Sequence, residues 1–483
     1  MTARYITTTL PYVNAGAHIG FAVEILQADV LARLWRLQGD EVFFNTGTDE
    51  HGQKIFEAAE KAGEDVQKYV DTYAASFQKL KDTLDISNDA FIRTTDENHI
   101  KAAQELWKRC DANGDIEKKI FKGLYCVGCE KFLMERDLVD GKCPLHPDRK
   151  PEEREEENYF FKFSKYESYL LEYLEKEVIV PEHRLEEARQ FVKNGLEDFS
   201  ISREKEKMSW GVPVPGDGSQ VMYVWMDALT NYISTLGWPE DEEGKFKKFW
   251  VNGETLQVAG KDQVRFQSLM WQAMLKSAWL PATKKIFYHG FITSEGKKMS
   301  KSIGNVISPN ELVERYGTDA TRYLLLRHVH SFDDTDITWE RLDEWYEAHL
   351  VNGLGNLVAR VTKLLQDYNI EIPVDFTQVL IENESNVHNI AHDLSLNAFN
   401  FNTALDILWK KVQQMDLKMT ESEPFKLIRE NFKEGEKILV EIASGVYLIG
   451  HQLEPFMPEI SQTITTSILM SQKPKNLFPR LEK

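Results

Sequence analysis

Cysteine is scarce in this chain of 483 residues, which contains only four, and three of those lie in one short segment. Long apolar runs are also missing, because none approaches the length of about 20 residues that crosses a bilayer. The first residues, Met1 to Tyr5, lack the apolar core of a signal peptide. We therefore expect a cytoplasmic protein without a membrane-spanning segment.

Positive charge is in deficit as well, with 58 Lys and Arg against 77 Asp and Glu and a net charge of −19. No global positive field surrounds such a chain, so indiscriminate nucleic-acid binding is excluded and any RNA contact must be local. Acidic runs at 152–157 and 240–243 are interpreted as solvated faces. The balance of 42% hydrophobic and 28% charged residues is that of a globular protein, long enough for two to four compact units.

The hydrophobic pattern of the first part alternates between strands and helices. Strand-like runs at 5–10 and 41–46 alternate with helical runs at 21–37, 55–61 and 66–84. Strand-like runs return at 220–226, 255–259 and 285–288, with a helical run at 264–277. This order predicts an α/β fold, a Rossmann-like parallel nucleotide-binding sheet that is split by an insertion.

The last part of the chain has a helical period only. Apolar residues recur at helical spacing between residues 350 and 365, and again at 405–415 and 438–453, which predicts an α-helical bundle. We expect five segments. They are a first half of the catalytic domain (1–112), a connective insertion (113–215), a second half (216–290), a lysine-loop region (291–344) and the helical domain (345–483).

Two elements suited to phosphate lie far apart in the sequence. His18-Ile19-Gly20-Phe21 opens a helical run, whose backbone N–H groups and dipole can face an anion. Lys298-Met299-Ser300-Lys301-Ser302 adds ammonium groups, with Lys297 before it, on a loop between Gly296 and Gly304. Taken singly, the first is also compatible with a capped helix start and the second with a solvated basic turn. Together they favour one composite ATP site.

The two elements resemble the HIGH and KMSKS signatures of class I aminoacyl-tRNA synthetases. The second is matched at all five positions, whereas in the first Phe21 stands where the family has a His. The resemblance implies that His18, Lys298 and Lys301 are catalytic groups at the ATP phosphates, with Gly20 and Ser300 also in the ATP site. Phe21 cannot donate the hydrogen bond of that histidine, so backbone N–H groups or the lysine loop would have to supply it.

More specifically, the chain resembles the methionyl-tRNA synthetase family over nearly its whole length. The resemblance rests on segments 9–14, 47–52, 223–232 and 260–271. It implies that Asp49 holds the substrate ammonium and that the following residues bind methionine with it: Leu10, Tyr12, Trp225, Ala228, Tyr232, Gln263, Gln267 and Trp271. Gln263 and Gln267 depart from the family, where a branched apolar residue and a His are common. Aromatic rings suit a polarizable thioether, although each ring alone also fits an ordinary core and Asp49 alone also fits a loop or helix cap.

In the helical part, Asn356 and Arg360 are four residues apart and therefore share one helix face. The family resemblance implies that they contact the tRNA anticodon and that Phe478 stacks on a base. The alternative is an ordinary hydrogen bond on a helix surface.

A zinc site is predicted by Cys126-Val127-Gly128-Cys129 followed by Cys143-Pro144-Leu145-His146. Thiolates and imidazole are the preferred ligands of tetrahedral zinc, and each pair can fold as a tight knuckle. Four protein ligands leave no position for a reactive water, so we expect one structural zinc held by Cys126, Cys129, Cys143 and His146. The alternative is a disulfide with a stray His, while Cys110 is interpreted as a buried apolar residue.

The resemblance implies a methionine–tRNA ligase whose partners are ATP with Mg²⁺, L-methionine and tRNA(Met), with no membrane. The absence of a further domain after Lys483 leads us to expect a monomer. Two alternatives stay open: another class I synthetase, for leucine, isoleucine, valine or cysteine, and a tRNA-binding homologue without catalysis.

Overall fold

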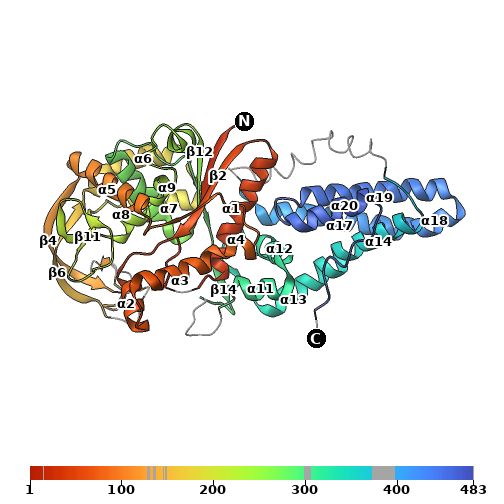
Figure 1. Cartoon of the computed structure of the whole chain (residues 1–483), viewed down its shortest axis with the longest axis horizontal. Helices are drawn as coiled ribbons and strands as arrows, with labels where there is room; N and C mark the ends of the chain where they lie inside the picture. Colours follow the sequence, from red (N-terminus) through yellow and green to blue (C-terminus); the bar gives the residue numbers. More distant parts are fainter. Residues whose placement is uncertain are drawn as a thin grey trace. The chain divides into compact units, whose positions relative to one another are not determined.

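The computed structural model describes residues 1–14, 16–127, 131–133, 138–144, 146, 150–298, 306–372 and 398–481. The chain forms two compact units (Figure 1). The sheet unit contains Met1–Gly16, Asp40–Lys79 and Asn88–Tyr288, and the helical unit contains Ala17–Gly39, Leu80–Ser87 and His289–Lys483. Each unit is assembled from separate stretches of sequence, and the five boundaries predicted above stay predictions.

A six-stranded sheet in the order β3-β2-β1-β12-β13-β7 is the centre of the sheet unit. All of its pairings that the structure describes are parallel. The strands are β1 (Ala3–Thr7), β2 (Glu41–Thr48), β3 (Ala90–Arg93), β7 (Ile179–Val180), β12 (Glu254–Gly260) and β13 (Lys285–His289). From β1 the chain first proceeds outward through β2 and β3, and it later resumes beside β1 with β12. The strand order therefore reverses between β1 and β12, the place where open α/β sheets bind their ligands.

The sheet unit also contains helices, some of which contact this sheet directly and others through the shared core. They are α2 (Gln53–Ala62), α3 (Val66–Gln78), α5 (Glu97–Ala112), α6 (Glu167–Glu175), α7 (Glu182–Lys193), α8 (Val224–Ala228), α9 (Asn231–Ser234) and α10 (Trp271–Ser277). The main core joins sheet residues such as Tyr5 and Tyr288 to Trp107 of α5, Leu170 of α6 and Trp271 of α10. Parallel strands covered in this way are expected to be mostly apolar. These strands are largely buried, but they also carry buried polar residues such as Asn45, Thr48 and Gln257.

The insertion adds a four-stranded sheet in the order β5-β4-β6-β8 and a three-stranded sheet in the order β10-β11-β9. The strands of these sheets are β4 (Ile116–Cys126), β5 (Lys131–Leu133), β6 (Glu152–Phe161), β8 (Phe199–Ser200), β9 (Ser202–Glu204), β10 (Pro213–Val214) and β11 (Asp217–Met222), the last of which lies just beyond the predicted end of the insertion at residue 215. A 3₁₀ helix (Phe163–Tyr166) precedes α6. The interval also contains β7, which joins the edge of the parallel sheet. The insertion is therefore tied into the catalytic sheet by a strand of two residues, too short for a pattern to predict.

The described part of the helical unit consists of α-helices, a π-helix (Tyr346–Gly355) and a small sheet in the order β15-β14-β16. The strands are β14 (Ile292–Ser294), β15 (Lys297–Lys298) and β16 (Thr335–Asp336). The helices are α1 (Ile19–Leu37), α4 (Leu80–Thr83), α11 (Pro309–Tyr316), α12 (Thr318–His328), α13 (Trp339–Trp345), α14 (Asn356–Asp367), α17 (Phe401–Ser422), α18 (Pro424–Glu430), α19 (Phe432–Gln452) and α20 (Pro458–Leu469). Helix α19 packs against α14, α17, α18 and α20, so the predicted helical bundle is confirmed (Figure 1).

A wholly buried ion pair holds the helical unit together. Arg322 of α12 contacts the Asp29 carboxylate of α1 at 2.8 Å. It also donates to the carbonyl oxygens of Leu84 at 2.9 Å and of Phe456 at 2.7 Å. One guanidinium thus joins three segments that are remote in sequence.

The predicted fold class, an α/β protein with a split parallel sheet and a helical bundle, is confirmed. One predicted strand is partly wrong. The pattern predicts extended backbone at residues 220–226 as part of the parallel sheet, but β11 pairs antiparallel with β9 and β10 in a separate sheet and ends at Met222, and α8 begins at Val224. The aromatic and β-branched residues there favour a strand by themselves, and tertiary packing overrides that preference. Among the described residues, no helix is both long and apolar enough to span a membrane.

Candidate active site

The carboxyl ends of β1 and β2 bring Tyr12 and Asp49 side by side. Beyond the two strands, Tyr12 and Asp49 form an isolated parallel bridge. The Asp49 N–H donates to the Pro11 carbonyl at 3.0 Å, and the Val13 N–H donates to the Asp49 carbonyl at 3.3 Å. Asp49 is buried, whereas Tyr12 and the preceding Leu10 are half-buried. A buried carboxylate at this edge is chemically suited to an ammonium group.

Gly47 explains why this edge tolerates no larger residue. A Cβ atom at Gly47 would lie 1.9 Å from the Ile92 carbonyl oxygen of β3. Only glycine lets β2 and β3 approach this closely two residues before Asp49.

Trp225 and Ala228 of α8 lie in the same apolar cluster as Tyr12. The half-buried Trp225 ring also stacks on Phe266, with ring centroids 3.8 Å apart and an interplanar angle of 10°. Three motifs that are far apart in the sequence therefore meet around one indole. Its burial is incomplete, so a ligand can reach it.

Tyr232, Gln267 and Trp271 form a second, fully enclosed group in the main core. The Tyr232 and Trp271 rings are 5.8 Å apart, and the Gln267 amide donates to the Tyr232 hydroxyl at 2.7 Å. Gln267 lies in a π-helix (Phe266–Met270) that continues into α10. Short π-helical turns occur often at functional sites because they displace side chains from the regular helical face. The predicted helix at 264–277 therefore exists, but with an inserted π turn.

The hydrogen bond that the structure describes for Gln263 does not involve these rings. It belongs to a 3₁₀ helix (Lys261–Gln263) directly after β12, it is half-buried, and its amide donates to the Asp262 carboxylate at 3.1 Å. Its predicted contact with methionine stays a prediction.

A buried polar network joins the Asp49 segment to α8. His51 Nδ1 bonds to one oxygen of the Asp227 carboxylate at 2.7 Å, and His99 Nε2 of α5 bonds to the other at 2.8 Å. The second ring nitrogen of His99 bonds to the Ser234 hydroxyl at 2.9 Å. Burial alone would raise the pKa of Asp227, but the two imidazoles outweigh it and lower the pKa to about 2. Asp227 is therefore ionised at neutral pH although it has no exposed surface.

Sequence patterns pointed to the segments of His51 and Asp227 but assigned neither residue a role. His99 had no signal of its own, because a histidine on the buried face of a helix looks like any core residue.

In the helical unit, His18 caps α1. Its Nδ1 accepts from the Gly20 N–H at 3.0 Å, and its carbonyl accepts from the N–H groups of Phe21 and Ala22. The Ile19 N–H donates to the Ile307 carbonyl. The N–H groups of the first turn are thus taken by protein acceptors, which leaves the helix dipole but not those donors for an anion. Because Nδ1 accepts, Nε2 carries the proton and is the donor that His18 offers.

Phe21 is buried in the first turn of α1. Its side chain serves packing, and the described N–H groups of residues 19–22 have protein acceptors. The expected compensation for the missing histidine, by backbone N–H groups or the lysine loop, stays a prediction.

The lysine loop begins in a tight hairpin. Thr293 and Ser294 of β14 pair with Lys298 and Lys297 of β15. Both turn residues have positive φ, 55° at Glu295 and 69° at Gly296, as a type I′ turn requires. The Gly296 N–H donates to Asp336 of β16 at 2.7 Å. The predicted ATP ligands Ser300 and Lys301, and Gly304 with them, lie outside the described residues, so the hairpin shows only how the loop leaves the small sheet.

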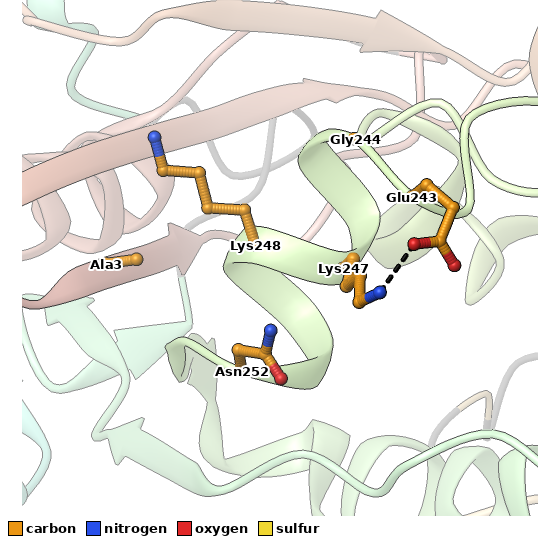
Figure 2. A pocket seen from close by; sticks show the side chains of 6 residues that line it. All are labelled: Ala3, Glu243, Gly244, Lys247, Lys248 and Asn252. Carbon is orange, nitrogen blue, oxygen red and sulfur yellow. Dashed lines mark hydrogen bonds and ion pairs between the residues drawn. The ribbon is translucent and has the colours of Figure 1, made fainter.

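A surface hollow of about 280 Å³ lies beside Ala3, at the amino end of β1 (Figure 2). It is lined further by Glu243, Gly244, Lys247, Lys248 and Asn252. Lys247 is paired with Glu243 (Figure 2), and Lys248 with Glu41. The hollow is at the end of the strand opposite to Tyr12 and its lysines are neutralised, so we assign it no part in the site.

Comparison with known proteins identifies the family. A family profile described as "tRNA synthetases class I (M)" matches residues 4–149 and 146–362. A methionine–tRNA ligase of Thermotoga maritima is 39% identical, over 97% of this chain and 76% of that protein. One of Caldanaerobacter subterraneus subsp. tengcongensis is 41% identical, over 94% and 72%. The chain belongs to the methionyl-tRNA synthetase family. The resemblance predicted from the motifs is therefore confirmed.

The solved structures agree with this assignment. The methionyl-tRNA synthetase of Mycobacterium tuberculosis in complex with methionyl-adenylate is 33% identical and has a TM-score of 0.89. The match covers all of this chain and 98% of that one. The fold of this chain is thus that of a methionyl-tRNA synthetase.

Three of the four predicted zinc ligands meet in the insertion. The Sγ atoms of Cys126 and Cys143 each lie 3.9 Å from His146 Nδ1. The three ligand atoms lie within 4.8 Å of one another. Tetrahedral ligands at zinc bond lengths are about 3.6 to 3.8 Å apart, so these residues fit a zinc ion with small adjustments. Cys129 lies outside the described residues, and Cys110 is buried in the main core as predicted.

The predicted anticodon residues lie in the helical unit. Asn356 is exposed at the start of α14, and Arg360 one turn later contacts Asp416 of α17 at 2.8 Å. A π-helix (Tyr346–Gly355) continues directly into α14. Phe478 is only 6% exposed and contacts the Tyr346 ring edge-on. It can stack on a base only after leaving this contact, so its role stays a prediction.

Proposed function

We propose that this chain is a methionine–tRNA ligase. It activates L-methionine with ATP to methionyl-adenylate and transfers the methionyl group to the 3′ end of tRNA(Met), for initiation and elongation of translation. The observation that carries the proposal is the cluster of Tyr12, Trp225 and Ala228, in which Tyr12 lies beside Asp49, in a chain that is 39% identical to a methionine–tRNA ligase over almost its entire length.

In the first step, a methionine carboxylate oxygen attacks the α-phosphorus of ATP. The bond from that phosphorus to the bridging oxygen breaks, and pyrophosphate leaves with the electron pair. The protein contributes by holding both substrates in line and by stabilising charge on the pyrophosphate. We assign the second task to the Nε2–H of His18 and to Lys298 and Lys301, with Gly20 and Ser300 beside the nucleotide.

Methionine recognition is assigned to the two aromatic groups. Asp49 holds the ammonium, and Leu10, Tyr12, Trp225 and Ala228 line the accessible part of the pocket. Sulfur-to-ring contacts contribute about 0.3 to 1.5 kcal/mol each, which favours a thioether over a purely aliphatic side chain. We place Tyr232, Gln267 and Trp271 behind the pocket, with Gln263 at its edge.

In the second step, a hydroxyl of the terminal ribose of the tRNA attacks the acyl carbon of the adenylate, and AMP leaves. The anticodon of that tRNA is proposed to contact Asn356 and Arg360 on α14. Phe478 would add base stacking if it turned outward. The amide and the guanidinium supply both donors and acceptors for a base edge.

Two metal ions accompany the proposal. Zinc, bound by Cys126, Cys143 and His146 with Cys129 as the fourth ligand, would stabilise the insertion. Magnesium would arrive with the triphosphate and neutralise part of its charge, and we assign it no ligand in this chain. A monomeric state and a cytoplasmic location stay predictions of the sequence.

Exchange of radiolabelled pyrophosphate into ATP, measured with each amino acid in turn, tests the first step. Methionine-dependent exchange alone supports the proposal, and exchange with leucine, isoleucine, valine or cysteine would replace it with another class I activity. No exchange with any amino acid, together with retained binding of tRNA(Met), would indicate a homologue without catalysis. That second candidate is kept because Phe21 stands at a signature histidine. Charging of tRNA(Met) tests the transfer step.

A further inference from the structure

The inference concerns the buried carboxylate of Asp227, and it rests on the proposed function. Asp227 lies between Met226 and Ala228 in α8, directly beside pocket residues. It accepts hydrogen bonds from two imidazoles that come from separate parts of the chain, 176 residues away for His51 and 128 for His99. A wholly buried carboxylate is costly to desolvate, so a single charge bonded at both oxygens requires an explanation.

The chain around His51 is held from several sides. The Trp210 ring lies 5.4 Å from the His51 ring, and the Trp210 indole N–H donates to the Glu50 carbonyl at 2.6 Å. Glu50 itself forms a two-pronged ion pair with Arg93, at 2.7 and 2.8 Å. The segment after β2 is therefore braced along its backbone and at Glu50, and the bond from His51 to Asp227 links it to α8.

The bond to Asp227 also determines which ring nitrogen of His51 carries the proton. Because Asp227 is ionised and accepts at Nδ1, the proton of a neutral His51 lies on Nδ1 and its Nε2 carries a lone pair. If the charge of Asp227 were removed, His51 would no longer be held in the tautomer that has its proton on Nδ1. An amide at position 227 offers one acceptor and one donor, so one of the two histidines would have to reverse its proton.

We infer that Asp227 is a positioning residue for methionine binding: through His51 it fixes the Asp49 segment against the α8 segment that carries Trp225 and Ala228. His99, held by Ser234, orients the second carboxylate oxygen. Asp227 itself need not touch the substrate. Its contribution is the spacing between the ammonium ligand on one wall of the pocket and the aromatic ring on the other.

The test uses Asp227→Asn in the full chain, with KM and kcat of pyrophosphate exchange measured for methionine and for ATP. We expect KM for methionine to rise about tenfold or more, the size of one charge-assisted hydrogen bond, while KM for ATP stays within about twofold. Asp115→Asn is the matched control. Asp115 is also a buried carboxylate of the sheet unit, and it accepts hydrogen bonds from Asn113, Lys165, Tyr166 and Ser277, which lie outside the predicted pocket.

Two further measurements distinguish the proposed positioning role of Asp227 from a purely structural role. In a His51→Ala background, Asp227→Asn should change KM for methionine by less than about twofold, because the path through His51 is already lost. His99→Gln, whose amide can donate from the position of Nε2, should retain most of the wild-type KM, and His99→Leu should not. If Asp227→Asn does not fold, the comparison of His99→Gln with His99→Leu tests the inference instead.

Three results would overturn the inference. One is an unchanged KM for methionine in a folded Asp227→Asn protein, and another is an equal rise of both KM values. The third is an effect of Asp227→Asn that persists undiminished without His51. Each presupposes an active wild-type enzyme, so they are distinct from failure of the proposed function, in which the wild type shows no methionine-dependent exchange and the inference fails with it.

Discussion

The buried contact between Gln267 and Tyr232 allows a quantitative prediction. The Gln267 side chain has no exposed surface, and among the described residues its amide forms one hydrogen bond, to the Tyr232 hydroxyl at 2.7 Å. Its oxygen has no partner there. Tyr232→Phe removes the acceptor and leaves the whole amide buried without a partner.

Leaving such a group unsatisfied costs about 1 to 3 kcal/mol, so Tyr232→Phe should lower the free energy of unfolding by that amount. Gln267→Leu should cost less, because it also removes the unpartnered oxygen. In the double variant, Gln267→Leu with Tyr232→Phe, the amide is gone, and stability should recover by about 1 kcal/mol or more relative to Tyr232→Phe alone.

Guanidinium unfolding followed by circular dichroism and tryptophan fluorescence measures these differences. Both probes are needed because a chain of two units need not unfold in one transition. Pyrophosphate exchange on the same proteins should show a larger rise of KM for methionine than for ATP in Tyr232→Phe. The reasoning is refuted if the two single losses simply add in the double variant, since additivity would mean that the amide and the hydroxyl do not depend on each other.

Three further predictions follow from the site and the fold. Lys301→Ala should slow methionine-dependent pyrophosphate exchange about 100-fold or more, as the loss of a charge-stabilising group does. Lys247→Ala, in the hollow of Figure 2, is the control and should not slow it. Equal exchange rates of the two variants would contradict a role of Lys301 at the phosphates. Cys143→Ser should lower bound zinc, measured by atomic emission on the purified protein, well below one ion per chain, and retention of full zinc would contradict the assigned ligand. The folded pKa of Asp227, about 2, lies below the usual 3.8, so its stabilisation is complete above about pH 4 and is lost as the pH falls towards 2. Over that window the free energy of unfolding should fall by about 2 kcal/mol in the wild type but not in Asp227→Asn. Parallel acid-unfolding curves of the two proteins would contradict this.

Local sequence patterns predicted much of the fold because they act over one or two turns or strands. The alternation of apolar runs located β1, β2, β12, β13 and helix α1 to within a few residues, but it predicted no helix at α5. The composition of residues 224–226 predicts a strand, yet these residues begin α8. The edge strand β7 and the π turn at Phe266–Met270 had no pattern of their own. At α8, packing against distant segments outweighs the local preference for a strand.

The candidate site shows the same division. The motif segments and the spacing of the zinc-ligand residues were predictable, because they depend on which residues are present and at what spacing. The occupied N–H groups of α1, the burial of Phe478 and the partnership of Gln267 with Tyr232 were not, because they depend on which atoms meet.

The sequence by itself determined the family, the chemistry its motifs can perform and the periods of its helices and strands, all of which are properties of residues close together in the chain. Only the tertiary structure decided that the Asp227 carboxylate is shared by His51 and His99, which reach it across 176 and 128 residues. The physical reason is that a buried charge is stable only where folding brings donors to it, and no local pattern records where those donors come from.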